Sequence, residues 1–347
     1  MENLLVNKVA AVKEVRQAAE YQKKKQACIL TGLSGSSKPV FFAAADKLLG
    51  GKGSMAFITA SREEIRTYRR ELNYLYPDLP MQELYPVSLP RVQADTQSLE
   101  LQAGRAAALR FLSGEERGIV FITAEALQQK QLRPSGMSGK ALQLAVGEEH
   151  EQRNIAAALL DLGYERTEQV DALGQFCLRG DILDVYPINS SAAVRIEWFD
   201  NELDAMRSFD VDSQRSLQTL TSIKIAPLKV DESFSYDADI FEYCAADTMV
   251  VVDEPVHVFG MLEKLDKENK EHASELFGKQ ELIEQLAANG AVLVSALGHS
   301  YLQQLPSLNI PVRAVAPYNK NTNLLVEDLQ NWLAEGITPL IMLSGSI

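Results

Sequence analysis

The sequence is poor in the residues that form disulfides and zinc sites. Three cysteines and four histidines are scattered along 347 residues, at Cys28, Cys177, Cys244, His150, His257, His272 and His299. No two cysteines form a C-x-x-C pair, and the histidines lack the spacing typical of metal ligands. We therefore expect neither a disulfide framework nor a metal site, and the free cysteines favour a reducing, cytoplasmic compartment.

Long apolar segments are also lacking. No apolar run approaches the roughly 20 residues of a membrane-spanning helix. Residues 1–22 form a charged, amphipathic pattern rather than a secretory signal. We expect no membrane partner.

An excess of positive charge is missing as well. The formal net charge is -13, which argues against nucleic-acid binding by this chain alone, because such binding needs a concentrated basic surface. The basic run at residues 23–25 is typical of a solvated helix end. With 46% hydrophobic and 23% charged residues the composition is that of a globular protein, and the length allows two or three domains.

The sequence does contain a regular alternation of apolar strands and helices. Strands are predicted over residues 26–31, 54–59, 81–87, 118–123, 247–252, 291–295 and 312–316. Helices are predicted over residues 3–21, 40–49, 61–76, 96–112 and 256–279. Ser61 and Glu64 form a capping-box pattern at the start of one helix. This alternation predicts an α/β domain with a mainly parallel, helix-covered sheet.

The composition changes at a stretch rich in proline, glycine and serine that begins near residue 131. A helix over 152–162 and short strands after it predict a separate α+β domain. We expect a parallel-sheet domain of residues 1–130 and 233–318, interrupted by an inserted domain of residues 131–232. Residues 319–347 would then begin a further domain, with a helix over 325–333 and a strand over 339–344. That strand ends just before the chain does, so we expect a fragment of a longer protein.

A degenerate nucleotide loop follows the first predicted strand. The segment GLSGSSKP at residues 32–39 nearly has the P-loop spacing G-x-x-x-x-G-K-[ST]. Gly32 and Lys38 fit, whereas Ser37 replaces the second glycine and Pro39 replaces the Mg²⁺-binding hydroxyl. Proline offers neither a hydroxyl nor an N–H, and without Mg²⁺ hydrolysis loses its main electrostatic support. We expect Gly32, Gly35, Ser37, Lys38 and Pro39 to form an inactive loop, with no catalytic residue and no cofactor in this chain.

An acidic pair ends the strand predicted over residues 247–252. Asp253 and Glu254 have the form of a Walker B motif, in which one carboxylate holds Mg²⁺ and the other activates water. The alternative is that Asp253 caps the helix predicted from residue 256, with Glu254 and Pro255 in its first turn. Because the P-loop is altered, we favour the capping alternative and treat the pair as a degenerate Walker B motif.

Residues 174–217 predict a run of short strands with two different faces. Alternation along one strand places two sets of three residues on opposite faces, Val194, Ile196 and Trp198 on the apolar face and Arg195, Glu197 and Phe199 on the mixed face. Asp200 and Asn201 predict a hairpin turn after this strand.

The mixed face allows two interpretations. An exposed Phe199 beside Arg195 suits a protein contact, because arginine recognises carboxylates in a planar, bidentate way and phenylalanine adds desolvated area. Alternatively, Arg179 and Arg195 form ion pairs within the domain, and Phe199 is part of the core. The acidic candidates for such pairs are Asp181, Asp184 and Glu197. From the residues alone, the second interpretation is favoured.

This block resembles the inserted domain of the bacterial transcription-repair coupling factors, the Mfd family. The family signature is present as GQFCLRGDILDVYP at residues 174–187, RIEWF at residues 195–199 and MRSFDVDSQR at residues 206–215, with Ala205 where the family has serine. The chain is also similar in arrangement to the family's N-terminal UvrB-like module: a RecA-like domain with a degenerate P-loop, interrupted by a UvrB-type interaction domain. The repair protein UvrB shares the inserted domain but keeps an intact P-loop and a tyrosine-rich hairpin, which residues 32–123 lack.

The resemblance implies a function in nucleotide excision repair of DNA damage. The family's inserted domain docks UvrA through two arginines and a phenylalanine, which fall on Arg179, Arg195 and Phe199, so the docking interpretation becomes the preferred one. Family members are ATP-driven DNA translocases that displace RNA polymerase, and their sites for ATP, Mg²⁺, DNA and polymerase lie in domains beyond this chain. The resemblance thus implies a non-catalytic docking module that could also contact the absent C-terminal domain. The alternative is a UvrB-like ATP-dependent repair subunit with a working site at Lys38, Asp253 and Glu254.

Overall fold

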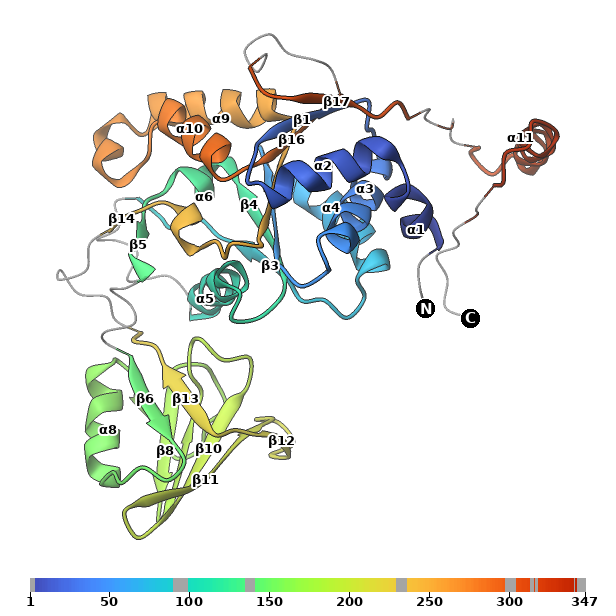
Figure 1. The fold of residues 1–347 in the computed structure, drawn as a ribbon. Coiled ribbons are helices and arrows are strands. Elements are labelled where there is room, and N and C mark those ends of the chain that lie inside the picture. The colour runs from blue at the N-terminus through green and yellow to red at the C-terminus, as the bar shows by residue number, and fades with distance from the viewer. Residues whose placement is uncertain are drawn as a thin grey trace.

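The chain folds into a larger α/β domain and a smaller domain built mainly of strands (Figure 1). The computed structural model describes residues 4–89, 99–134, 141–228, 236–296, 304–312, 315, 318–339 and 341. The strand predicted over 339–344 lies largely outside these residues. The two parts that are described, Pro339 and Ile341, are not in a strand.

The larger domain is organised around a seven-stranded sheet in the order β17-β1-β16-β15-β2-β4-β3. All six strand pairs are parallel, as predicted. The strands are β1 (Cys28–Thr31), β2 (Met55–Thr59), β3 (Met81–Leu84), β4 (Ile119–Thr123), β15 (Met249–Asp253), β16 (Val292–Ser295) and β17 (Ser307–Asn309). The strand predicted over 312–316 lies largely outside the described residues, and the two parts that are described, Val312 and Val315, are not in a strand. The strand that joins β1 at this edge is β17, which the sequence did not predict.

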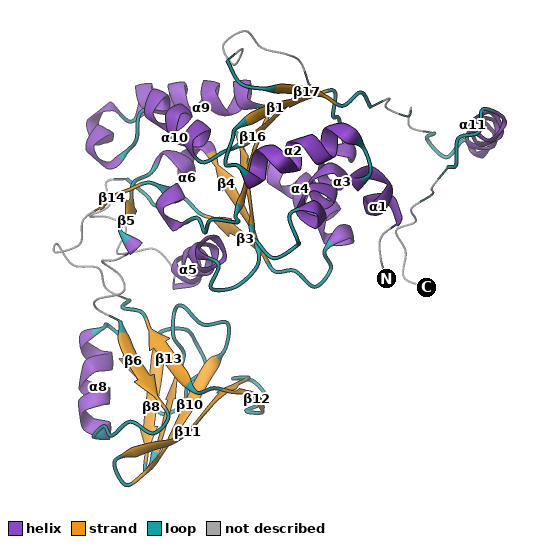
Figure 2. Ribbon diagram, in the orientation of Figure 1, coloured by secondary structure: helices purple, strands orange, loops and turns teal. Residues whose placement is uncertain are grey.

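Helices cover both faces of this sheet (Figure 2). They are α1 (Leu4–Ala10), α2 (Lys13–Lys23), α3 (Ser37–Leu48), α4 (Arg62–Leu75), α5 (Leu99–Ser113), α6 (Ala124–Gln128), α9 (Pro255–Glu268) and α10 (Lys279–Ala288). Alternate strand residues enter two separate cores, so Phe57 packs with α3 and α4 whereas Ile58 packs with α6 and α9. Burying such side chains stabilises the fold by about 1.5–3 kcal/mol each.

Two predicted helices are interrupted. The helix predicted over 3–21 breaks at Val12, whose backbone is extended, and the break allows Val6 of α1 and Val15 of α2 to enter the same core. The helix predicted over 256–279 ends at Glu268, and a 3₁₀ segment, η3 (Lys270–Glu275), separates α9 from α10. Asn269 and Gly278, both poor helix formers, lie at these ends.

The smaller domain contains a six-stranded sheet in the order β12-β11-β10-β9-β8-β7. Its strands are β7 (Glu165–Arg166), β8 (Gln175–Arg179), β9 (Ile182–Val185), β10 (Ala193–Phe199), β11 (Glu202–Phe209) and β12 (Ser216–Thr219), all antiparallel neighbours except β7 and β8. The helix α8 (Gln152–Asp161) and the pair β6 (Leu142–Ala145) and β13 (Ser222–Ile225) share one core with the sheet. Val194, Ile196 and Trp198 enter that core, as predicted.

The two connections between the domains run side by side. β5 (Gln131–Leu132) pairs with β14 (Tyr236–Ala238) in an antiparallel bridge, and η2 (Ile240–Tyr243) follows β14. The predicted boundary near residue 131 falls in β5, and the boundary at residue 232 lies outside the described residues. The helix α11 (Thr322–Ala334), predicted over 325–333, has no buried residue and lies away from the sheet (Figure 1).

Candidate nucleotide loop and docking face

The loop with P-loop-like spacing connects β1 to α3 at the carboxyl end of the parallel sheet. Gly32 has a φ of +86°, and a Cβ there would lie 2.6 Å from the carbonyl oxygen of Ile310. Glycine is therefore required at this position by the approach of the segment that follows β17. Ser37 opens α3, and Pro39 is buried in its first turn.

Three N–H groups of this loop are engaged within the loop. The Ser37 and Lys38 N–H groups donate to the carbonyl oxygens of Ser34 and Gly35, each at 3.2 Å. The Ser34 N–H donates to the Ser37 hydroxyl at 2.9 Å, and Pro39 has no N–H to offer. A phosphate cradle needs free N–H groups at a helix N-terminus, and the engagement of these three groups and the proline disfavour a nucleotide phosphate here.

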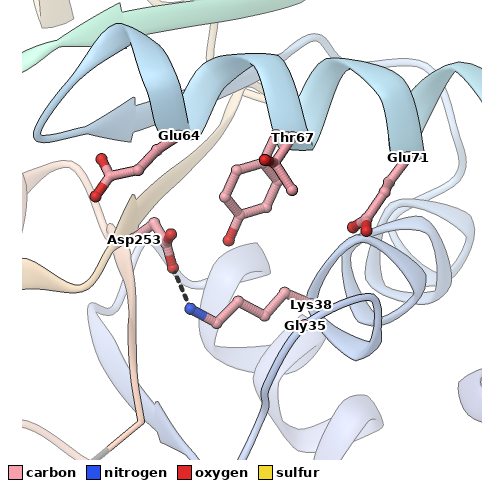
Figure 3. Close-up of a pocket in the computed structure, with 7 residues that line it drawn as sticks. Gly35, Lys38, Glu64, Thr67, Glu71 and Asp253 are labelled. Carbon is pink, nitrogen blue, oxygen red and sulfur yellow. Dashed lines mark hydrogen bonds and ion pairs between the residues drawn. The ribbon is translucent and has the colours of Figure 1, made fainter. Parts of the chain in front are cut away.

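Lys38 is held by the acidic pair that ends β15. Its Nζ lies 2.6 Å from Asp253 Oδ1 (Figure 3). It also lies 2.9 Å from Glu254 Oε1. Burial opposes the charged form, but the two carboxylates outweigh burial and raise the pKa of Lys38 above its usual value. The predicted capping role of Asp253 is wrong, because its carboxylate binds Lys38 and the N-cap of α9 is Glu254, at a φ of +44°.

A small acidic cavity lies beside this ion pair. It has a volume of about 200 Å³ and is lined by Gly35, Lys38, Glu64, Thr67, Tyr68, Glu71 and Asp253. Figure 3 shows Glu64 and Glu71 reaching towards it from α4. Ligand pockets usually measure about 300–1,000 Å³, and carboxylates outnumber Lys38 here. Size and charge both disfavour an anionic nucleotide.

The helix α4 begins with a capping box and carries a row of exposed arginines. The Ser61 N–H donates to Glu64 at 3.1 Å, so the predicted capping box is present. Four exposed arginines lie on the outward face of the same helix: Arg62, Arg66, Arg69 and Arg70. They were not predicted, because they do not form one consecutive basic run in the sequence. Their helical spacing was the signal that could have found them.

Strand pairing in the smaller domain brings the predicted docking residues onto one face. Asp184 of β9 lies opposite Cys177 on one side and Arg195 on the other, and Ile182 lies between Arg179 and Glu197 in the same way. Residues two apart on a strand share a face. Arg179 therefore lies on the face of Arg195, a point that the sequence left open.

One buried carboxylate binds both arginines. Asp184, 2% exposed, accepts from Arg195 Nε at 2.6 Å and from Arg195 Nη2 at 2.7 Å. Arg179 Nη2 lies 3.4 Å from Asp184 Oδ2. The intradomain pairing predicted as the alternative is thus present at Asp184, whereas Asp181 accepts from Gln152 and Glu197 from Arg207.

Phe199 is not part of the core. Its residue surface is 78% exposed, at the end of β10 where Asp200 turns into β11 with a φ of +58°. The predicted hairpin turn is confirmed, because Phe199 pairs with Glu202. Phe199, Arg179 and the exposed Ile182 occupy the same end of the sheet, and we call this end and the Asp184–Arg195 pair behind it the docking face.

Neither metal ligands nor membrane helices are found in the described parts of the chain. There, no cluster of three or more histidine, cysteine, aspartate or glutamate side chains is arranged to hold a metal ion. Over the same residues, every helix is too short or too polar to cross a membrane.

Comparison with known proteins defines the class of the smaller domain. Residues 142–230 match the family described as the UvrB interaction domain. The chain thus carries a domain of the type that the signature at residues 174–187 predicted.

Proteins with similar sequences include the transcription-repair coupling factors of several bacteria. The chain is 36% identical to the factor of Bacillus subtilis (strain 168) over 203 residues, which are 58% of this chain and 17% of the relative. It is 28% identical to that of Escherichia coli (strain K12) over 165 residues, 48% of this chain and 14% of the relative. The predicted resemblance is confirmed, and the match covers less than a fifth of the relatives' length.

Proposed function

We propose that this chain serves as the recruitment part of a transcription-repair coupling factor and docks UvrA through the docking face. The observation that carries the proposal is that the exposed Phe199 and Arg179 lie at the same end of one sheet, in a domain similar to UvrB interaction domains. Arginine and aromatic residues are enriched among the few side chains that carry most of the binding energy at protein interfaces.

The docking proposal is tested by a pull-down with a bacterial UvrA. A variant that combines Arg179→Ala, Arg195→Ala and Phe199→Ala should lose retention, since one central anchor typically contributes about 2 kcal/mol or more. Arg153→Ala and Leu217→Ala are matched controls, because both side chains are exposed elsewhere in the same domain. Unchanged retention of a folded triple variant would remove the site assignment.

The remaining partners of the coupling function belong, in our proposal, to segments of the relatives that this chain does not span. RNA polymerase, DNA, ATP and Mg²⁺ would be bound there, and this chain would contribute no catalytic group in the cytoplasm where repair takes place. Contact between the docking face and an absent C-terminal domain would restrain docking. We further propose that the larger domain is RecA-like with a degenerate P-loop and Walker B pair, supported by the meeting of Lys38 with Asp253 at the carboxyl end of parallel strands.

The alternative function is a UvrB-like ATPase, and the same contact between Lys38, Asp253 and Glu254 is the observation in its favour. Titration of the protein with ATP and Mg²⁺, followed by calorimetry and phosphate release, separates the two. We expect no binding in the micromolar range, because three of the loop N–H groups are engaged and the cavity is acidic. Tight binding or turnover would establish the alternative.

A further inference from the structure

The two arginines of the docking face differ in what they can offer a partner. The Arg195 side chain is 18% exposed, and its Nε and Nη2 are bound by Asp184, with Nη2 also donating to Gln214 Oε1 at 3.0 Å. Its guanidinium carbon lies 4.6 Å from the centre of the buried Phe209 ring. The Arg179 side chain is 56% exposed, and its nearest carboxylate oxygen lies at 3.4 Å.

We infer that Arg195 and Asp184 position the docking face, while Arg179 and Phe199 contact the partner. This division of roles rests on the proposed docking of UvrA. Arg195 uses its charge and two of its three guanidinium nitrogens in contacts within the domain. Arg179, in contrast, exposes more than half of its side chain to solvent. Asp184 is a positioning residue, because it holds β8 and β10 together through the two guanidinium groups on either side of β9.

The exposed end of the sheet sets the chemistry of the partner surface. Arg179 ends β8, Ile182 begins β9 and Phe199 ends β10, so a cation and two apolar side chains lie on three neighbouring strands at one end of the sheet. Glu197 is neutralised by Arg207 beside them. The fitting surface presents a carboxylate for Arg179 next to an apolar pocket for Phe199 and Ile182. Arginine and carboxylate form paired, charge-assisted hydrogen bonds in such a setting.

The test measures the affinity of each variant for UvrA by titration. It compares single substitutions with a double substitution that removes both charges of the buried ion pair. Arg179→Gln should weaken binding about tenfold, and Phe199→Ala about 30-fold. Arg195→Gln should also weaken binding at least about tenfold, because it leaves Asp184 as a buried, uncompensated carboxylate. The double variant Asp184→Asn/Arg195→Gln removes both charges and allows an amide-to-amide hydrogen bond. It should bind within about threefold of the unaltered protein.

Ionic strength provides an independent measure of which arginine touches the partner. Arg179→Gln should flatten the dependence of affinity on salt, because it removes an ion pair between the two proteins. The double variant should keep the full dependence. Thermal denaturation of each variant shows whether it is folded, and Arg153→Gln and Leu217→Ala report on substitutions outside the docking face.

Different outcomes would overturn the docking of UvrA and the division of roles between the two arginines. Unchanged binding by folded Arg179→Gln and Phe199→Ala variants overturns UvrA docking itself. Loss in those two variants, together with a double variant as weak as Arg195→Gln, would overturn the division of roles and make Arg195 a contact residue. Loss in the two variants with recovery in the double variant supports the division.

Discussion

The ammonium group of Lys38 lies between two carboxylates and takes the position of a counter-ion at the end of β15. Two carboxylates in a largely buried place need a cation nearby, since neither can be fully hydrated. Lys38 supplies that cation from within the chain. At the residue scale, Lys38 thus forms a structural contact between α3 and the end of β15.

Lys38→Met should therefore destabilise the fold, by about 3 kcal/mol, because Asp253 and Glu254 lose their cation. The pKa of Lys38 is raised, so its charge stabilises the fold at every pH below the ordinary lysine pKa, and this contribution is lost only as the pH rises through the raised value. Urea denaturation should give a constant difference between the two proteins at neutral pH and a smaller one above about pH 10.5. Exposed Lys52 gives the control, Lys52→Met, and an equal loss there would contradict the prediction.

Burial also lowers the expected reactivity of two cysteine thiols. It raises the pKa of Cys28 and of Cys244 to about 12. Only the thiolate reacts readily with disulfide reagents, so both residues should label slowly at pH 8 in the folded protein and rapidly after unfolding in urea. Peptide mapping identifies which cysteines are labelled. Rapid labelling of Cys28 and Cys244 in the folded protein would contradict the prediction.

At the scale of elements, the short β17 depends on a glycine in another part of the chain. The Ile310 N–H donates to the Thr31 carbonyl at 2.8 Å, directly after β17 pairs with β1. The Ile310 carbonyl then passes so close to Gly32 that no Cβ fits between them. β17 is thus held in place by the close approach of the segment after it to the loop that follows β1.

Gly32→Ala should cost several kcal/mol and release β17, because it adds a backbone clash to a positive φ. Gly35→Ala is the matched control: its φ is also positive, at +51°, but no atom lies within 4 Å of the added Cβ. That variant should lose only about 1 kcal/mol. Thermal denaturation gives the two losses, and hydrogen exchange at Leu308 reports on β17. Equal losses would show that the close approach does not matter.

The sequence predicted the elements whose signal is local and missed those set by distant contacts. The buried strands of the large sheet follow from their apolar runs, and the start of α4 follows from Ser61 and Glu64. The break at Val12 and the position of β17 depend on packing against other elements, so periodicity alone did not reveal them. The Asp184–Arg195 bond depends on strand register across β9 and β10, and the sequence offered three acidic candidates without a way to choose.

At the scale of the whole molecule, the two domains have separate cores. The buried cluster around Trp198 draws its members from residues 144–225, and none of them belongs to the clusters of the larger domain. Contacts between the domains include the approach of Leu99 of α5 to Gly174. A domain with its own core generally folds alone.

A protein of residues 141–228 should therefore unfold cooperatively and bind UvrA within a few-fold of the complete chain, because every residue of the docking face lies inside it. Urea denaturation followed by Trp198 fluorescence tests folding, and titration of UvrA tests docking. A folded segment that fails to bind would place part of the interface in the larger domain. The Phe199→Ala form of the same segment is the control for specific binding.

The bridge between Leu132 and Tyr236 has a consequence for how such a chain can change over time. These two residues are paired in an antiparallel bridge. The inserted domain therefore joins the larger domain in the way that a loop joins the two strands of a hairpin. Hairpin loops can be lengthened at small entropic cost once their ends are fixed. The exchange of one insertion for another, or its replacement by a short turn, would leave the parallel sheet and its two cores unaltered.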